Sequence, residues 1–268
     1  MQKKSDYPTK VFKYRNWSCE KHRTILLENE LFFTSPKDFN DPFDYKISED
    51  FLQLDTEEKI DAYISQKRKH YQKDTPKKRL EENLKRLKHR LIHEPQKVQE
   101  EYNNLYFEGV NHYKGVLSLS ERWNSILMWS HYGDSHKGFC VGFWEEKLRT
   151  NLITSGGKVF YPTDDKIPSI NPLDDFLPNM FHESHTKARD WNYEQEYRLV
   201  KEFYPVIASI EDRKQKFENH YISEIIVGLN ASDDAKQNII HLGNQKGVPV
   251  YQCTRIASEF ALGRQLLT

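Results

Sequence analysis

The chain of 268 residues lacks several features that would fix its class at once. It has only three cysteines, Cys19, Cys140 and Cys253, and their spacing suggests neither a CxxC metal site nor a disulfide framework. No apolar run approaches the roughly 20 residues of a transmembrane helix. The opening MQKKSDYPTKVF has no apolar stretch typical of a signal peptide. We therefore expect a cytoplasmic protein whose cysteines pack in its core.

An excess of one charge is also missing, because 40 Lys and Arg balance 40 Asp and Glu. A net charge of zero gives no global field that would select nucleic acid or an anionic membrane. The chain has no Walker loop, no GxGxxG after a strand and no GxSxG. Aromatic side chains, in contrast, are plentiful, with 15 Tyr, 15 Phe and 5 Trp, and they supply enough apolar area for a sizeable core.

The order of expected elements indicates an α+β fold in a single domain over residues 1–268. We expect helices at 18–29, 124–132 and 232–245, and strands at 11–15, 31–35, 115–120, 137–144, 158–163, 190–200, 224–229 and 248–254. Apolar residues at helical spacing predict a helical hairpin inserted at 53–113, with its second helix starting near Pro95. Its apolar stripe comprises Leu80, Leu84, Leu87, Leu91, Val98, Tyr102 and Leu105.

Two segments of the chain have a strong excess of one charge, although the whole chain is neutral. Residues 67–90 carry eleven Lys and Arg against three acids, whereas residues 41–61 carry eight acids against two lysines. Two interpretations stay open for the basic segment. It forms solvated helix faces that the acidic segment balances, or it contacts a polyanion such as nucleic acid.

The stretch DWNYEQEYRLV, residues 190–200, places Glu194, Glu196 and Arg198 at every second position. In a strand these three side chains would share one face. Two neighbouring carboxylates raise the energy of each other's charge. Either this face is exposed to water and Arg198 softens the repulsion, or the pair of glutamates carries chemistry.

Five strings follow one another along the chain: KYR (13–15), LFFTSPKDFNDPFD (31–44), LSLSERWNSILMWSHYGDSHKGFCVGF (117–143), DWNYEQEYRLV (190–200) and EIIVGLNAS (224–232). In this order they resemble a bacterial family known only as domain of unknown function 2971. The resemblance extends from about residue 12 to residue 255, without the helical insertion.

More distantly, the chain resembles the ADP-ribosyltransferase-like superfamily through Arg15 in KYR, Ser118 and Ser120 in SLS, and Glu194 and Glu196 in YEQEYR. This resemblance implies a split β-sandwich and the transfer of ADP-ribose from NAD to an unknown acceptor, in bacteria often by a toxin or a phage-defence effector. It implies that Arg15 grips the dinucleotide and that the serines orient the ribose or a carboxylate. Glu196 would be the catalytic residue and Glu194 would contact the acceptor.

Further candidates for contact with NAD are His131 and Tyr132, at the end of a short helix. Alternatively, His131 only interacts with the helix C-terminus. The spacing of His131, Asp134 and His136 matches no familiar site, so we expect no metal. The acids and the asparagine of NDPFD (40–44) either line the pocket or brace their loop.

Other functions remain open on the sequence alone. Arg15 can be a structural arginine that pairs with an acid of the NDPFD loop. The protein can bind or cleave nucleic acid through residues 67–90, or bind NAD or a partner protein without turnover. Cys140, between Phe139 and Val141, is expected to be a packed strand residue rather than a nucleophile.

Overall fold

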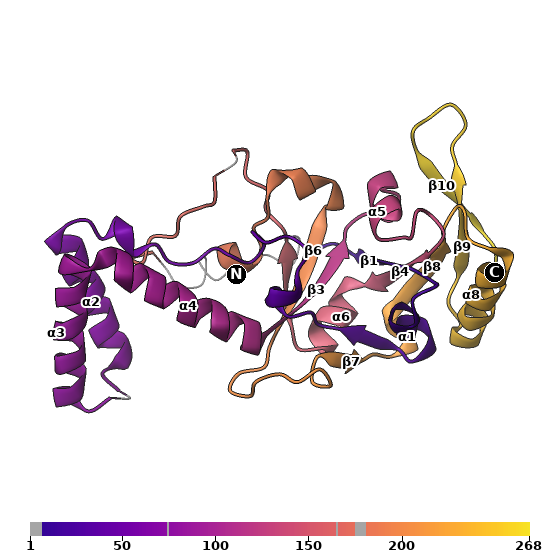
Figure 1. Cartoon of the computed structure of the whole chain (residues 1–268). Helices are drawn as coiled ribbons and strands as arrows, with labels where there is room; N and C mark the ends of the chain where they lie inside the picture. The colour runs from indigo at the N-terminus through magenta and orange to yellow at the C-terminus, as the bar shows by residue number, and fades with distance from the viewer. Residues whose placement is uncertain (1–6, 74, 165, 175–180) are drawn as a thin grey trace.

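The computed structural model describes residues 7–73, 75–164, 166–174 and 181–268 and is built around a mixed sheet of eight strands (Figure 1). Among the described residues, the strand order is β10-β9-β8-β4-β1-β3-β6-β5, and only β8 and β9 pair in parallel. A small second sheet pairs β2 with β7. The α+β class is confirmed. The strands are β1 (Lys10–Arg15), β2 (Glu30–Phe32), β3 (Lys114–Ser120), β4 (Phe139–Trp144), β5 (Ser155–Lys158), β6 (Glu196–Glu202), β7 (Lys214–Lys216), β8 (Ile222–Val227), β9 (Val250–Arg255) and β10 (Leu262–Leu266).

The large sheet is weakly joined between β1 and β3. In the described part of the chain these strands pair through one residue couple, Phe12 with Ser120. Elsewhere the backbone ladder between them is not continued, and the side chain of Lys13 donates a hydrogen bond from Nζ to the carbonyl oxygen of Ser118 at 2.5 Å. The split β-sandwich implied by the resemblance is not confirmed, because both strands belong to the same sheet.

Apolar clusters lie on both faces of the sheet. The main cluster joins the strands to α1, α6 and α8 through Leu26, Leu148 and Ile239. A second cluster packs Trp129 of α5 against Tyr14 and Cys140. The helices are α1 (Glu20–Leu27), α2 (Glu57–Tyr71), α3 (Lys77–His93), α4 (Pro95–Tyr113), α5 (Ile126–His131), α6 (Glu145–Asn151) and α8 (Asp233–Lys246).

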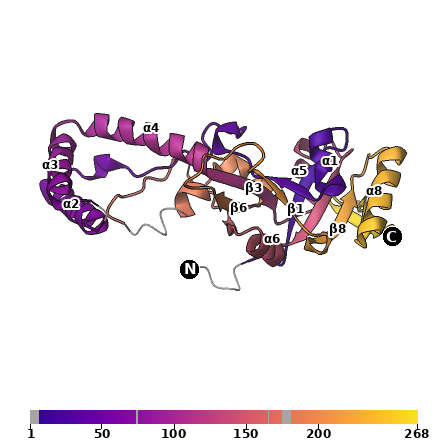
Figure 2. The ribbon, with the colours of Figure 1, turned by 90° about the horizontal axis from the view of Figure 1, so that it is seen from below.

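Helices α2, α3 and α4 lie between β2 and β3 in the sequence and have an apolar cluster of their own. Figures 1 and 2 both show α2 and α3 at one end of an elongated molecule and α8 near the opposite end. Helix α4 leads back to the sheet and, as predicted, begins at Pro95. The predicted stripe is largely buried, but Leu105 is 71% exposed, so its place in the stripe was wrong. The single domain with an insertion at 53–113 stays a prediction.

Two strand predictions need correction. The strand expected at 158–163 lies earlier, as β5, and Phe160 makes only an isolated bridge. The stretch 190–200 is not one strand: residues Arg189–Glu194 form a 3₁₀ helix and β6 begins at Glu196. Gln195 between them is left-handed, with φ of 40°, and this turn ends the helix and starts the strand.

Smaller differences concern helix ends and cysteines. The short helix α5 is capped by Ser125, whose hydroxyl accepts from the Met128 N–H, rather than by Asn124. Cys140 and Cys253 are buried as expected, but Cys19 is partly exposed. No helix in the described residues is long and apolar enough to cross a membrane.

Candidate functional site

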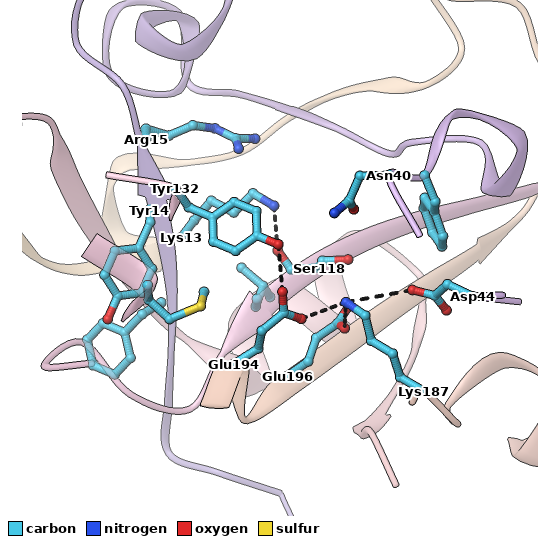
Figure 3. Close-up of a pocket in the computed structure, with 14 residues that line it drawn as sticks. Lys13, Tyr14, Arg15, Asn40, Asp44, Ser118, Tyr132, Lys187, Glu194 and Glu196 are labelled. Carbon is cyan, nitrogen blue, oxygen red and sulfur yellow. Dashed lines mark hydrogen bonds and ion pairs between the residues drawn. The ribbon is translucent and has the colours of Figure 1, made fainter. Parts of the chain in front are cut away.

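A pocket of about 110 Å³ opens beside the weak junction of β1 and β3 (Figure 3). Its lining comes from β1, the loop after β2, β3, the region of α5 and the segment around the start of β6. Five residues singled out from the sequence line it: Arg15, Ser118, Tyr132, Glu194 and Glu196. The other lining residues are Phe12, Lys13, Tyr14, Phe39, Asn40, Asp44, Leu119, Met128 and Lys187.

Lys187 is the centre of a buried cluster of charges on one wall of this pocket (Figure 3). Its Nζ lies 2.6 Å from Glu194 Oε2, 3.2 Å from Glu196 Oε2 and 3.8 Å from Asp44 Oδ2. Both glutamates are almost fully buried, with 4% and 3% of their surface exposed. The alternative that this face is exposed to water is therefore wrong. The two carboxylates lie close together because a lysine ammonium stands between them.

Arg198 completes the cluster from the interior. Its Nε donates to Glu196 Oε1 at 2.7 Å, and its Nη2 donates to Glu196 Oε2 at 3.0 Å and to Asp44 Oδ2 at 2.6 Å. Arg198 is fully buried, and its Nη1 donates to the Ser184 carbonyl at 2.8 Å. Such two-pronged contact fits the planar guanidinium to a carboxylate. The geometry holds Glu196 and Asp44 in fixed positions.

The two glutamates differ in acidity because their partners differ. Burial would raise the pKa of Glu196, but the charges of Arg198 and Lys187 and hydrogen bonds from Arg198 and Ser118 hold it well below its usual range. Burial raises the pKa of Glu194, and the nearby charge of Glu196 adds to the increase against the opposing effect of Lys187. Two neighbouring carboxyl groups whose pKa values differ strongly are suited to two different roles in one reaction.

The opposite wall carries positive charge from β1. Lys13 and Arg15 are two residues apart on this strand, and both line the pocket. Burial lowers the pKa of Arg15 to about 10, and burial together with the charge of Arg15 lowers the pKa of Lys13 well below its usual value. Among the ion pairs of the described residues, none involves Arg15, so pairing with an NDPFD acid is wrong: Asp44 pairs with Arg198 and Lys187 instead.

The two serines of SLS have different surroundings. Ser118 lines the pocket, and its side chain bonds to Glu196. Ser120 is fully buried and lies outside the described lining. Its Oγ donates to the Glu194 carbonyl at 2.6 Å and accepts from the Arg122 N–H at 3.1 Å. Ser120 therefore fixes the backbone just before β6.

The two candidate residues at the end of α5, His131 and Tyr132, also differ in their position relative to the pocket. Tyr132 lines the pocket, and its Oη donates to Glu194 Oε1 at 2.6 Å. Burial and this hydrogen bond raise the pKa of Tyr132, so the phenol stays a donor. His131 is exposed outside the described lining, with Nδ1 2.9 Å from Tyr193 Oη. A direct contact of His131 with a ligand in the pocket has no support from this position.

Sequence reasoning missed Lys13 and Lys187 and left Asn40 and Asp44 undecided. Lys187 lies in a loop without periodicity, so no pattern marked it. Lys13 was detectable, because it shares with Arg15 the alternate positions of a strand that was correctly predicted. In the NDPFD loop, Asn40 and Asp44 line the pocket, whereas Asp41 accepts the Phe43 N–H at 2.9 Å and braces the turn.

The donor set does not suit a metal ion. Within the described ranges, no group of three or more His, Cys, Asp and Glu side chains is placed to hold one. The three acids of the pocket are occupied by Lys187 and Arg198, whose charges would repel a cation.

Comparison with known families supports one assignment. The family model described as "Protein of unknown function (DUF2971)" matches residues 128–199. This part of the chain is therefore similar to that family. The matched segment runs from α5 into β6 and includes Tyr132, Lys187, Glu194 and Glu196 of the pocket. Searches among curated proteins and among solved structures found no match.

Proposed function

We propose that this protein is an ADP-ribosyltransferase that takes NAD as substrate and passes ADP-ribose to an acceptor. One observation carries the proposal. Arg15, Ser118 and Glu196 come from three strands that are successive neighbours in the sheet, β1, β3 and β6, and all line one pocket. They occur in the order Arg, Ser, Glu that the resemblance to the superfamily implies. A role as a toxin or phage-defence effector belongs to this proposal and is supported by the resemblance alone.

The charges around the pocket suit cleavage of the bond between ribose and nicotinamide. This cleavage has an oxocarbenium-like transition state, so positive charge develops on the ribose. Arg198 and Lys187 keep Glu196 ionised, and its carboxylate then faces that charge in a site largely shielded from water. Ser118 holds the carboxylate in position through its side-chain hydrogen bond.

Glu194 is suited to the second half of the reaction. An acceptor must lose a proton as it bonds to the ribose, and a carboxylate of raised pKa is the better base near neutral pH. Burial raises the pKa of Glu194, while Tyr132 and Lys187 hold its two oxygens. We therefore assign Glu196 to cleavage of NAD and Glu194 to the acceptor.

The positive wall is suited to the phosphates of NAD. Arg15 is a guanidinium in the pocket wall without an ion pair among the described residues, and an unpaired charge that is largely removed from water is costly. A pyrophosphate can accept two parallel hydrogen bonds from it. The volume of the pocket, about 110 Å³, is smaller than that of a dinucleotide site, so one end of NAD enters and the remainder lies over the opening.

The test is release of nicotinamide from NAD by the pure protein, followed by mass spectrometry. Glu196→Gln keeps the shape of the side chain but removes its charge, and we expect a loss of about two to three orders of magnitude in rate. Glu194→Gln should reduce transfer more than NAD hydrolysis. The matched control is Glu202→Gln, at the exposed end of the same strand.

Glu196 is buried, so its replacement also weakens the fold, and circular dichroism must show that each variant is folded at the assay temperature. A folded Glu196→Gln variant as active as the parent rejects the assigned role. A parent that releases no nicotinamide rejects the reaction. If that parent still binds NAD, the domain is a binding module instead.

A second candidate function, binding of nucleic acid, is favoured by the surface of α2 and α3. Of the eleven cations at 67–90, Arg68, Lys88 and Arg90 form ion pairs and Lys67 lies over the ring of Tyr63. The remaining cations are exposed and form no ion pair within the described residues; they are Lys69, Lys73, Lys77, Lys78, Arg79, Lys85 and Arg86. A polyanion contacting them is compatible with the transferase if nucleic acid is its acceptor.

A further inference from the structure

Tyr132 brings a hydroxyl group into the pocket beside the two glutamates. It follows α5 directly, lines the pocket and is partly buried. Its Oη lies 2.6 Å from Glu194 Oε1, and Figure 3 shows the ring directing this hydroxyl at the carboxylate of Glu194. In the reaction proposed above, Tyr132 only holds Glu194 in place. A hydroxyl at hydrogen-bonding distance from a carboxylate is also the arrangement of a nucleophile and its general base.

This hydroxyl is close to the place where the ribose of NAD is expected. Lys187 Nζ lies 2.6 Å from Glu194 Oε2 and 3.2 Å from Glu196 Oε2, so the two carboxylates are neighbours on one wall. A ribose that faces Glu196 therefore occupies the same small pocket, of about 110 Å³, that Tyr132 lines. A confined site keeps a nucleophile and a bound substrate at high effective concentration.

Two other residues of the pocket bond to a glutamate through a nitrogen or hydroxyl, and both are less suited to attack the ribose. Burial alone would lower the pKa of Lys187, but the charges of the neighbouring glutamates raise it, so its nitrogen stays protonated and has no free electron pair. Ser118 bonds to Glu196, whose low pKa makes that carboxylate a poor base. Tyr132 instead bonds to Glu194, the carboxylate of raised pKa.

Lys13 is the remaining nucleophile to consider, because burial lowers its pKa well below the usual value. Its Nζ donates to the carbonyl oxygen of Ser118 at 2.5 Å, and among the described residues no hydrogen bond joins it to a glutamate. Lys13 therefore has no carboxylate beside it that could take its proton. A product on Lys13 is a competing outcome, and peptide mapping distinguishes it from a product on Tyr132.

We propose that Tyr132 is the first acceptor of ADP-ribose, so that the protein modifies itself at this residue. The step rests on the proposed cleavage of NAD. The bond between C1 of the ribose and the nicotinamide nitrogen breaks, and nicotinamide leaves with both electrons of that bond. An electron pair of the Tyr132 oxygen forms the new bond to C1, while the phenol proton passes to Glu194 and from there to water. The products are nicotinamide, one proton and ADP-ribose joined to the Tyr132 oxygen.

The phenol depends on Glu194 for this step. Burial and the hydrogen bond to Glu194 raise the pKa of Tyr132, so no phenolate forms in the resting protein. The proton therefore leaves as the bond to the ribose forms, when the positive charge of the ribose offsets the developing negative charge on oxygen. Some glycosidases also use a tyrosine nucleophile on a sugar. The attached ADP-ribose then fills the small pocket, and further cleavage of NAD should be slow.

The experiment follows both products of this step. The full-length protein is incubated with NAD and quenched with acid at intervals; nicotinamide is measured by mass spectrometry, and the protein by intact mass and peptide mapping. We expect a burst of about one nicotinamide per protein, together with one ADP-ribose on Tyr132. Tyr132→Phe keeps the ring but lacks the oxygen, so it should show neither the burst nor the adduct.

Two further variants separate the base from the surroundings. Glu194→Gln still accepts the phenol hydrogen bond but is a far weaker base, so the adduct should form about two to four orders of magnitude more slowly. Tyr193→Phe is the matched control, because its hydroxyl lies at His131, outside the described lining, and it should be modified like the parent.

The possible outcomes separate this inference from the proposed function. A parent that releases nicotinamide but carries no ADP-ribose on Tyr132 at any time overturns the inference and keeps the transferase. An equal amount of adduct in Tyr132→Phe also overturns it, because another residue such as Lys13 then carries the group. A parent with neither nicotinamide release nor adduct rejects the transferase and the inference together. Mapping of the parent decides the site even if Tyr132→Phe does not fold.

Discussion

The cluster around Lys187 and the surface of α2 and α3 are both rich in charge, but the charges of the cluster are buried and most of those on the helices are exposed. In the cluster, each of Glu194, Glu196 and Asp44 touches a cation, and the cations are buried with them. On α2 and α3 most cations are exposed and have no counter-ion among the described residues. Local charge density in the sequence is therefore a poor guide to environment. The two regions differ in whether oppositely charged side chains from distant segments of the chain pack against the charges.

The largest expected effect is on folding, from removal of Arg198. Arg198→Ala leaves Glu196 and Asp44 buried with less compensation, and we expect a loss of about 3–5 kcal/mol in the free energy of unfolding. The measurement is urea denaturation. The dependence of the free energy of unfolding on urea concentration should be the same for variant and parent, so that the two values can be compared.

The same substitution on α3 is the control. Arg86→Ala removes an exposed arginine and should change the free energy of unfolding by no more than about 0.5 kcal/mol. If both variants lost the same free energy of unfolding, burial would not distinguish the cluster from the basic helices.

Much of the fold could be predicted from local patterns, because β1, β3 and β4 are short runs rich in apolar residues and α4 begins with a proline. The site was predicted in part for the same reason. Arg15 and Ser118 lie on predicted strands, and the glutamates reached the pocket although Gln195 breaks the alternation that suggested them. The contacts that bury the charged side chains of the site could not be predicted. Arg198 meets Asp44 across 154 positions of sequence, and Lys187 comes from a loop.

A buried acid with no ion pair among the described residues, Glu183, allows a further test of this comparison. Glu183 is 8% exposed, and its carboxylate bonds to the Tyr106 hydroxyl from α4. Burial raises the pKa of Glu183 from 4.5 to about 7. A raised pKa in the folded state means that Glu183 lowers stability as pH increases from about 4.5 to about 7, by at most roughly 3 kcal/mol.

The pH dependence of unfolding checks this sign. Relative to the parent, Glu183→Gln should become more stable as pH rises through that window, since the amide cannot ionise. Glu82→Gln, on the exposed surface of α3, should leave the profile unchanged. A difference between parent and Glu183→Gln that does not vary with pH would show that Glu183 titrates normally.

A smaller effect is expected on ligand binding, from a change that conserves charge. Arg15→Lys keeps the positive charge but loses the fork of donors that matches a pyrophosphate. NAD should bind more weakly by about 1–3 kcal/mol in calorimetry. Arg86→Lys makes the same replacement on α3 and should bind NAD like the parent. Equal dissociation constants for parent and Arg15→Lys would remove Arg15 from the site.

The smallest effect on folding is expected at the basic helices, where no buried partner depends on the charge. One variant replaces four exposed cations of α3 with glutamine, at Lys77, Lys78, Lys85 and Arg86. Its control replaces four lysines elsewhere on the surface, Lys21, Lys37, Lys137 and Lys236. Each single change should alter the free energy of unfolding by no more than about 0.5 kcal/mol.

Binding of nucleic acid separates the two variants where folding does not. If α2 and α3 contact a polyanion, the first variant should flatten the dependence of log affinity on log salt by roughly 0.7–0.9 for each phosphate that the protein no longer neutralises. The control should keep the slope of the parent, because its four lysines are scattered over other elements. A parent that binds no RNA or DNA at low salt would make the basic helices a solvated face. Water would then solvate the unpaired cations at little cost in free energy, whereas Lys187 and Arg198 are compensated by buried carboxylates.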